Sequence, residues 1–232
     1  MNEIIGKRKS IRKYDLSPLD AETLENIREQ IENVTPLYPD IRYSIEIANG
    51  IKGVFNNVKA PHYLVFFSEE KNGSYENVGF IGQQLNLFFA GAGIGACWLG
   101  ATKPGETEEF SKKHIASMSF GKPAEPLLRE LSDFKRKPLA EISEGIDARL
   151  EAARLAPSAV NSQNWFFVAE NDKIHCYRKK ANPLLGFIYN KLHCIDMGIA
   201  LYHIALESDD FRFEKESDVP ERNGCVYIGT VR

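Results

Sequence analysis

Apolar residues recur at helical spacing in two long segments of the chain. Around 76–90 they fall every three or four residues, at Val78, Ile81, Leu85, Phe88 and Ala92. Around 188–208 the same spacing holds for Ile188, Leu192, Ile195, Ile199, Tyr202 and Leu206. This periodicity predicts two mostly apolar helices, the first ended by the glycines at 91, 93 and 95.

Two further segments carry helix signals. Ser17-Pro18-Leu19-Asp20 offers a cap residue at Ser17, a proline for the first helical position and an acid for the first turn. A one-sided apolar stripe follows, at Leu24, Ile27, Ile31 and Val34. Residues 146–155 occupy a corresponding place later in the chain. We therefore expect a helix in each segment, packed on one face.

Strand signals lie between and after the predicted helices. Tyr43–Ile47 alternates and runs into Asn49-Gly50, a pair typical of hairpin turns, and the apolar run Tyr63–Phe67 reads as a buried strand. Further strands are expected at Cys97–Leu99, Trp165–Ala169 and Ile174–Tyr177, with a turn at Asn171-Asp172, and near Phe211–Glu214 and Cys225–Gly229. The mixture predicts an α+β protein with a mainly antiparallel sheet flanked by helices.

The order of elements repeats along the chain. Overlaying the two parts pairs Pro157 with Pro36, the Asn171 turn with Gly50, and Asp196-Met197-Gly198 with Asn77-Val78-Gly79 at nearly one offset. We interpret this as an internal duplication, in which residues 1–145 and 146–232 are two degenerate halves of one compact unit. A period this long suggests two fused subunits, a pseudo-dimer with a bridge near 130–145.

Composition narrows the classes of function. The chain has 232 residues, 43% hydrophobic composition and a formal net charge of -3, without a basic tail, so we expect a folded protein with no nucleic-acid partner. No apolar run approaches the roughly 20 residues that cross a bilayer. We therefore expect a cytoplasmic protein with no membrane partner. The scattered cysteines and histidines indicate no metal site.

Three polar clusters are candidates for chemistry. The segment 8–14, RKSIRKY, would project Arg8, Ser10 and Arg12 to one side if extended, a face suited to a phosphate. The segment 156–167, APSAVNSQNWFF, places hydrogen-bonding side chains beside an aromatic strand, as a flat polar-edged ring requires. Lys135-Arg136-Lys137 is the third cluster. Taken singly, each also fits a solvated basic segment, a capped turn or an exposed linker.

Gly91-Ala92-Gly93-Ile94-Gly95-Ala96 matches the dinucleotide-binding fingerprint in letters. That fingerprint needs a strand before it and a helix after it, so that a pyrophosphate meets the helix N-terminus. Here a helix comes first and a strand follows. We therefore interpret the glycines as a helix end rather than a Rossmann site.

Taken together, RKSIRKY, GAGIGACWLG, SFGKPAE, KRKPLAEI and APSAVNSQNWFF resemble the FMN-dependent nitroreductase family, over nearly the whole chain. Their order is unusual, because the family's APS-x-x-N-x-Q segment normally follows the first helix. The order in this chain is similar instead to that of the fused, single-chain branch of the family, which is known from thermophilic bacteria. Asn164 also stands where the family usually has proline.

The resemblance implies a set of cofactor-binding residues and no catalytic side chain or metal ligand. Arg8 and Ser10 would bind the phosphate and ribityl region, and Arg12 would lie near the flavin N1 and O2 edge, while Gln163 and Lys135 are less direct candidates. The full implied set is Arg8, Lys9, Ser10, Arg12, Leu99, Gly100, Ala101, Arg136, Lys137, Pro157, Ser158, Ala159 and Asn161.

Each half keeps only one of the two flavin motifs. Half one carries R-x-S-x-R, but Pro36–Arg42 lacks the serine and asparagine of Pro157–Gln163, and half two lacks R-x-S-x-R. We therefore expect one FMN per chain, and a monomer is possible because the fusion replaces the family dimer. The implied activity is ping-pong reduction of small nitroaromatic or quinone acceptors by NAD(P)H. A flavin-binding or flavin-sensing protein without turnover, and a scaffold without flavin, are the alternatives.

Overall fold

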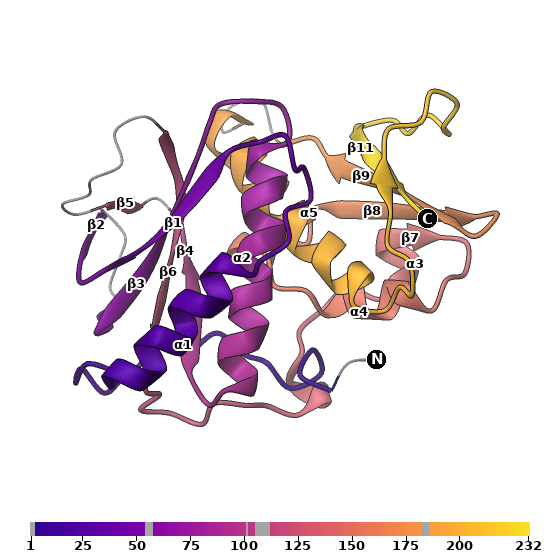
Figure 1. The fold of residues 1–232 in the computed structure, drawn as a ribbon. Helices are drawn as coiled ribbons and strands as arrows, with labels where there is room; N and C mark the ends of the chain where they lie inside the picture. Colours follow the sequence, from indigo (N-terminus) through magenta and orange to yellow (C-terminus); the bar gives the residue numbers. More distant parts are fainter. Residues whose placement is uncertain (1–2, 54–57, 101, 105–111, 182–185) are drawn as a thin grey trace.

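Two antiparallel layers flank a pair of long helices. The computed structural model describes residues 3–53, 58–100, 102–104, 112–181 and 186–232. Figure 1 shows one sheet on each side of the pair formed by α2 (Ser74–Gly91) and α5 (Gly186–Ala205). The remaining helices are α1 (Ala21–Glu32), α3 (Leu139–Ile142) and α4 (Arg149–Leu155). The family-independent part of the fold prediction, an α+β protein with antiparallel sheets and flanking helices, is confirmed.

The first sheet has four antiparallel strands. Their order is β1 (Tyr43–Ala48), β3 (His62–Ser68), β6 (Lys113–Gly121) and β4 (Gly95–Leu99). Every residue of β3 is buried, as its unbroken apolar sequence predicts. β6 lies between β3 and β4 and is not among the predicted strands, although Ala116, Met118 and Phe120 alternate with Ser117 and Ser119 as in a strand.

The second sheet has the order β10 (Phe213–Glu214), β11 (Cys225–Val231), β9 (Lys173–Lys179), β8 (Trp165–Glu170) and β7 (Ser143–Glu144). Only the short β7 is parallel to its neighbour. The turn between β8 and β9 has positive φ at Asn171 (51°) and Asp172 (61°), which suits a tight hairpin and confirms the predicted turn.

Apart from β7, the two sheets have the same strand order. The order β1-β3-β6-β4 of the first sheet corresponds to β8-β9-β11-β10 in the second, because in each the first two strands in the sequence are neighbours and the fourth lies between the second and the third. Matching helix-to-turn contacts accompany them: the Tyr38 amide donates to Asn77 Oδ1 at 3.0 Å, and the Ala159 amide donates to Asp196 Oδ1 at 2.8 Å. These four residues are the ones that the sequence overlay pairs.

Glycines allow α2 and α5 to approach closely. A Cβ atom on Gly79 would lie 2.1 Å from the carbonyl oxygen of Ile195, and one on Gly198 would lie 1.9 Å from that of Glu76. Any larger residue at either position would therefore push the helices apart. Apolar residues from both halves, among them Phe89, Trp165 and Ile199, form one continuous core around this contact.

Two local predictions were wrong. α1 begins at Ala21 with Asp20 as its N-cap, accepting the Thr23 amide, so the cap lies three residues after the predicted cap at Ser17. Asn49-Gly50 does not close a hairpin, because β1 pairs with β3 while β2 (Ile51–Gly53) pairs with β5 (Thr102–Pro104) in a separate ribbon. The second outcome depends on the pairing of distant strands, which local turn preference does not contain, whereas the first follows from the Asp20 side chain, which caps the helix locally.

The glycine-rich segment after α2 behaves as the sequence indicates. α2 ends at Gly91 with Ala92 as its C-cap, Gly93 adopts φ 79°, and Gly95 begins β4. Gly95 lies against the side chain of Ile11, where a Cβ atom would come within 2.8 Å of it. No helix opens after these glycines, which excludes the Rossmann arrangement.

Candidate functional site

The N-terminal segment runs along the edge of β4. The Ile11 amide donates to the carbonyl of Ala96 at 3.0 Å, and Ile11 itself is fully buried. Burial raises the pKa of the Cys97 thiol on β4. Three groups of the segment oppose this rise, namely Arg12, a hydrogen bond from Ser10, and Arg8. Arg8, Ser10 and Arg12 thus all act on one thiol, although Arg8 is buried, Ser10 half-buried and Arg12 exposed.

Lys9 points to other partners. It is half-buried, and it lowers the pKa of Glu125 after the larger contribution of the Arg12 amide, which donates to Glu125 Oε1 at 2.9 Å. The N-terminal segment is therefore held by backbone and carboxylate contacts on one side.

Arg8 is a buried cation without a counterion. Only 2% of its surface is exposed, and its Nε and Nη1 atoms have no hydrogen-bond partner. Burial first, and then the charges of neighbouring arginines including Arg129 and Arg136, lower the pKa of Arg8 to about 9. Leaving such donors unsatisfied is costly, and an anion at this position would offset that cost.

Arg129 and Arg136 complete a basic cluster with Arg8. Arg129 Nε donates to the Arg8 carbonyl at 3.0 Å, and its guanidinium stacks 3.4 Å from the centre of the Phe134 ring. Burial, followed by the charge of Arg129, lowers the pKa of Arg136 to about 10. In the described part of the chain, no carboxylate forms an ion pair with any of these three arginines. Sequence reasoning missed Arg129, which belongs to no motif in PLLREL.

The other two polar clusters of the sequence are joined to each other. Asn161 accepts a hydrogen bond from Arg136 Nη1 at 2.5 Å and donates to the Lys135 carbonyl at 2.8 Å. Gln163 Oε1 accepts the Lys137 amide at 2.8 Å, and Lys137 Nζ donates to the Ser162 carbonyl at 2.9 Å. Residues 135–137, called the basic tail below although they lie within the chain, therefore brace the turn 157–163, and Asn161 and Lys137 already have partners in this arrangement.

The turn 157–163, called the wall turn below, has an unusual backbone. Val160, Asn161 and Gln163 have φ of 47°, 57° and 50°, a region that non-glycine residues seldom occupy. Ser158 Oγ accepts the Gln163 amide at 3.0 Å across the turn. Pro157 is buried, Ser158 and Ala159 are half-buried, and the Val160 side chain is 84% exposed. Such strain is typical of functional sites.

α5 brings two residues to this region. Leu192 lies 3.8 Å from where a Cβ atom on Gly100 would stand, so α5 faces the end of β4. Asp196 accepts the Ala159 amide, and burial raises the pKa of its carboxyl group to about 7. Leu99 is buried, whereas Ala101 lies outside the described residues. Asp196 was not a sequence candidate for the site, although an acid within a mostly apolar helix was an available signal.

The structure thus gathers the three sequence clusters. The N-terminal segment, the basic tail and the wall turn meet at Arg8, Arg136 and Asn161. The N-terminal segment lies more than a hundred residues before the other two in the sequence. The family model described as "Putative TM nitroreductase" matches residues 1–208. The chain belongs to this family.

The chain is similar to several solved structures. A protein from Thermotoga maritima described as "a putative nitroreductase" is 20% identical, with 99% of this chain and 90% of that chain covered at a TM-score of 0.64. A nitroreductase family protein from Clostridium difficile is 16% identical over 61% of this chain and 96% of its own, at 0.48. A further C. difficile protein, named an FMN-dependent nitroreductase, is 16% identical over 58% and 95%, at 0.46. No curated protein matches the chain.

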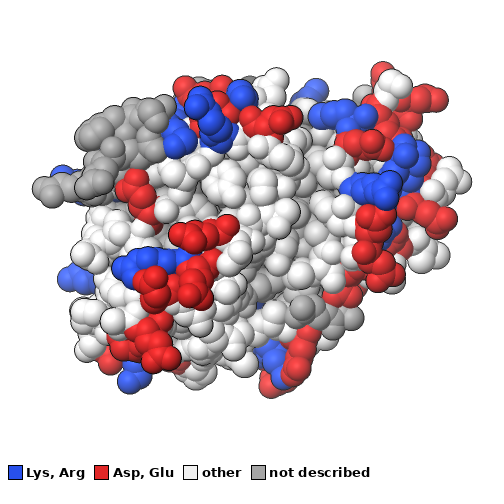
Figure 2. Space-filling model, viewed as in Figure 1, with Lys and Arg blue, Asp and Glu red and all other residues white. Residues whose placement is uncertain are grey.

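Across the described ranges, none of the helices combines the length and apolar character needed to span a bilayer. Charges of both signs alternate on the face shown in Figure 2, and its middle is largely uncharged. That face carries no broad basic field of the kind that concentrates nucleic acid.

Proposed function

We propose that this protein is an FMN-dependent oxidoreductase that takes electrons from NAD(P)H and passes them to small nitroaromatic or quinone-like acceptors. The observation that carries the proposal is the buried, unpaired guanidinium of Arg8 beside Arg129 and Arg136. A phosphate dianion would supply the acceptors and the negative charge that this cluster lacks. Family membership supports an oxidoreductase, and the FMN itself is inferred from the fit.

Each part of the site has a distinct task in this proposal. Arg8, Arg129 and Arg136 bind the phosphate, and Ser10 with Arg12 lies toward the ribityl chain and the pyrimidine edge. A bound FMN would supply the hydride-accepting and hydride-donating chemistry. Leu99 and Gly100 on one side, and Pro157 to Ala159 on the other, orient the ring and exclude water. Asn161 and Lys137 act by bracing the wall turn against the basic tail.

We infer one FMN per chain, at the junction of two fused halves. The shared strand order and the paired Asn77–Tyr38 and Asp196–Ala159 contacts support the fusion. At the wall-turn position of half one stands Tyr38, whose ring lies 5.9 Å from that of Phe213 on β10 and against Gly73. These aromatic rings fill the corresponding junction, which supports a single site and a monomeric working unit.

The first test counts flavin. The purified protein, reconstituted with excess FMN and then denatured, should release about one FMN per chain, as measured by its visible spectrum. Anaerobic NADH or NADPH should bleach the bound flavin. Release of two equivalents would contradict the single site, and failure of bleaching would favour a flavin-binding protein without turnover. Failure to bind FMN would overturn the proposal.

The second test removes the buried cation. Arg8→Met keeps side-chain length and should weaken FMN binding by about 10- to 100-fold while leaving riboflavin binding unchanged, because charge-assisted bonds contribute roughly 1.5–3 kcal/mol. Arg129→Met should act in the same direction. Arg28→Met, on the exposed side of α1 where Arg28 pairs with Glu25, is the control. Equal losses for FMN and riboflavin would show that Arg8 does not bind the phosphate.

A further inference from the structure

α5 presses a buried carboxyl group against the wall turn. Asp196 is 3% exposed, and its Oδ1 atom accepts the Ala159 amide at 2.8 Å. Among the described residues, its Oδ2 atom is buried without a partner in hydrogen-bonding geometry, and so is the hydroxyl of Ser162 in the same turn, which lies near enough to lower the pKa of the carboxyl group. One oxygen of the carboxyl group thus holds the turn, while the other faces a polar but unsatisfied environment.

The other half performs the same holding task with an amide. Asn77 on α2 accepts the Tyr38 amide at 3.0 Å through Oδ1, and its Nδ2 atom is buried without a partner. An amide oxygen is therefore sufficient to hold such a turn. Asp196 differs from Asn77 in that it can ionise, and this difference occurs in the half whose turn faces the proposed flavin.

The wall turn requires an external anchor. Three of its residues have positive φ without being glycine, and each such residue costs of order 1–3 kcal/mol unless surrounding contacts enforce it. Ala159 is the first residue of its short 3₁₀ segment, Ala159–Asn161. Its amide bond to Asp196 ties that segment to the rigid helix α5.

We propose that Asp196 is the positioning residue of the wall turn and that it takes up a proton when FMN binds. The inference rests on the proposed flavin site and deepens it. In the neutral state the carbonyl oxygen of Asp196 continues to accept the Ala159 amide, and the protonated oxygen donates to the Ser162 hydroxyl. Both buried oxygens of the acid are then satisfied without a negative charge buried beside the turn.

The immediate surroundings of Asp196 favour the neutral acid. Burial raises the pKa of the carboxyl group to about 7, against the Ala159 amide and the Ser162 hydroxyl, which lower it. Among the described residues, no Lys, Arg or His side chain forms an ion pair with Asp196. A buried acid without a cationic partner binds a proton readily.

The charged groups on the elements that pack around Asp196 affect the pKa values of other residues. On α5 itself, burial and Arg178 of β9 lower the pKa of His193. Burial and Glu76 of α2 raise the pKa of Cys194, to which Asp196 contributes less. The arginine cluster acts on His203, whose pKa burial lowers to about 3. None of these groups neutralises the Asp196 carboxylate.

The direction of the coupling follows from the ligand. FMN would displace water from the wall turn and add a phosphate anion, and both changes disfavour a buried carboxylate. The pKa of Asp196 would therefore rise further on binding. FMN affinity should be constant below about pH 6 and fall as the pH rises through 7, by at most tenfold per pH unit.

Amide hydrogen exchange of the apo-protein tests the positioning role without flavin. Asp196→Ala should accelerate exchange across residues 157–164, whereas Asp196→Asn, which keeps the acceptor, should restore protection. Asn77→Ala is the matched control, because it removes the equivalent bond in the other half and should accelerate exchange only near residue 38. Unchanged protection in Asp196→Ala would overturn the positioning role, whether or not the protein binds flavin.

FMN titrations, followed by quenching of flavin fluorescence between pH 6 and 8.5, test the proton. At pH 6, Asp196→Ala should bind FMN at least tenfold more weakly, and Asp196→Asn and Asn77→Ala should match the wild type. By pH 8.5 the wild type should have lost about tenfold relative to Asp196→Asn. Parallel pH profiles of FMN affinity for the wild type and Asp196→Asn would overturn the proton uptake. A loss of FMN affinity in Asn77→Ala equal to that in Asp196→Ala would overturn the specific role of Asp196. Absence of FMN binding by the wild type would instead reject the proposed function.

Discussion

At the scale of single residues, the site combines groups that are individually unfavourable. Arg8 is a cation buried without a counterion, Asp196 is an acid buried without a base, and Val160 is a β-branched residue at φ 47°. Each would destabilise a protein that needed only to fold. Their meeting at the junction of three sequence motifs indicates that the cost is retained for binding.

Val160 gives a direct measure of this cost. Asparagine tolerates positive φ far better than valine, and the 84% exposed Val160 side chain contributes little burial. Val160→Asn should therefore raise the free energy of unfolding of the apo-protein by about 0.5–1 kcal/mol in urea titrations. Val226→Asn, in strand β11 and packed on the core, should lower it. A Val160→Asn variant no more stable than the wild type would argue against strain in the turn.

At the scale of elements, the α2–α5 contact determines where the site lies. It brings Leu192 to Gly100 and Asp196 to the wall turn, so that residues of one half face the strand end of the other. The contact is close only because Gly79 and Gly198 each lie against a backbone carbonyl. A change in helix spacing should therefore alter both stability and the site.

Gly79→Ala and Gly198→Ala test this spacing. Each added methyl group meets a backbone oxygen, and overpacking of this kind typically costs about 1–3 kcal/mol. Gly91→Ala, at the end of α2 with nothing within 4 Å of the added Cβ, should instead be neutral or stabilising by up to about 1 kcal/mol. Chemical unfolding of the three variants compares them. Equal effects at all three positions would contradict the close helix contact.

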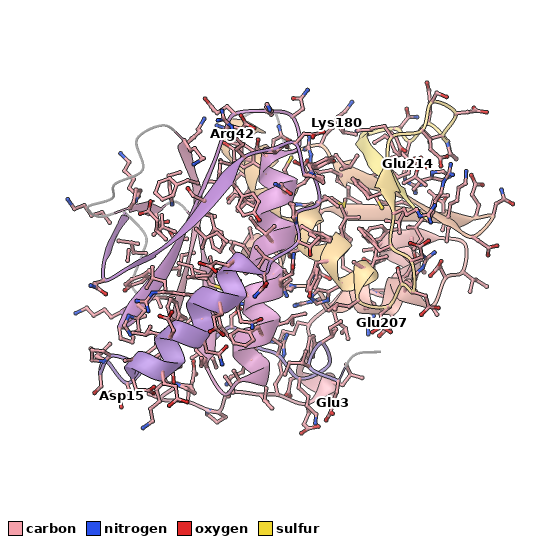
Figure 3. The ribbon with its side chains drawn as sticks, in the orientation of Figure 1. Glu3, Asp15, Arg42, Lys180, Glu207 and Glu214 are labelled. Carbon is pink, nitrogen blue, oxygen red and sulfur yellow. The ribbon has the colours of Figure 1, made fainter. Side chains whose placement is uncertain are left out.

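At the scale of the whole molecule, the two halves share one interior. Buried residues of both sheets belong to the same apolar core, and exposed charged residues such as Arg42, Lys180 and Glu214 lie at the outside of the molecule in Figure 3. Separation of the halves would expose the faces of α2 and α5 to water. Neither half is therefore expected to be stable alone.

Calorimetry checks this unity. The apo-protein should unfold in one transition whose calorimetric and van't Hoff enthalpies agree, because both halves contribute to one core. Gly79→Ala should shift that transition to lower temperature as a whole. Two resolved transitions, or a variant that moves only part of the heat absorption, would show that the halves are separate folding units.

The sequence by itself determined the elements whose signals are local. Helical spacing located α2 and α5, continuous apolar runs located β3 and β8, and motif letters indicated the N-terminal segment, the basic tail and the wall turn. Only the tertiary structure decided which strands pair, that β6 lies between β3 and β4, and that Arg129 and Asp196 join the site. The physical reason is that periodicity records how a segment meets its nearest surroundings. Strand pairing, the burial of a charge and its lack of a partner depend on residues far away in the chain.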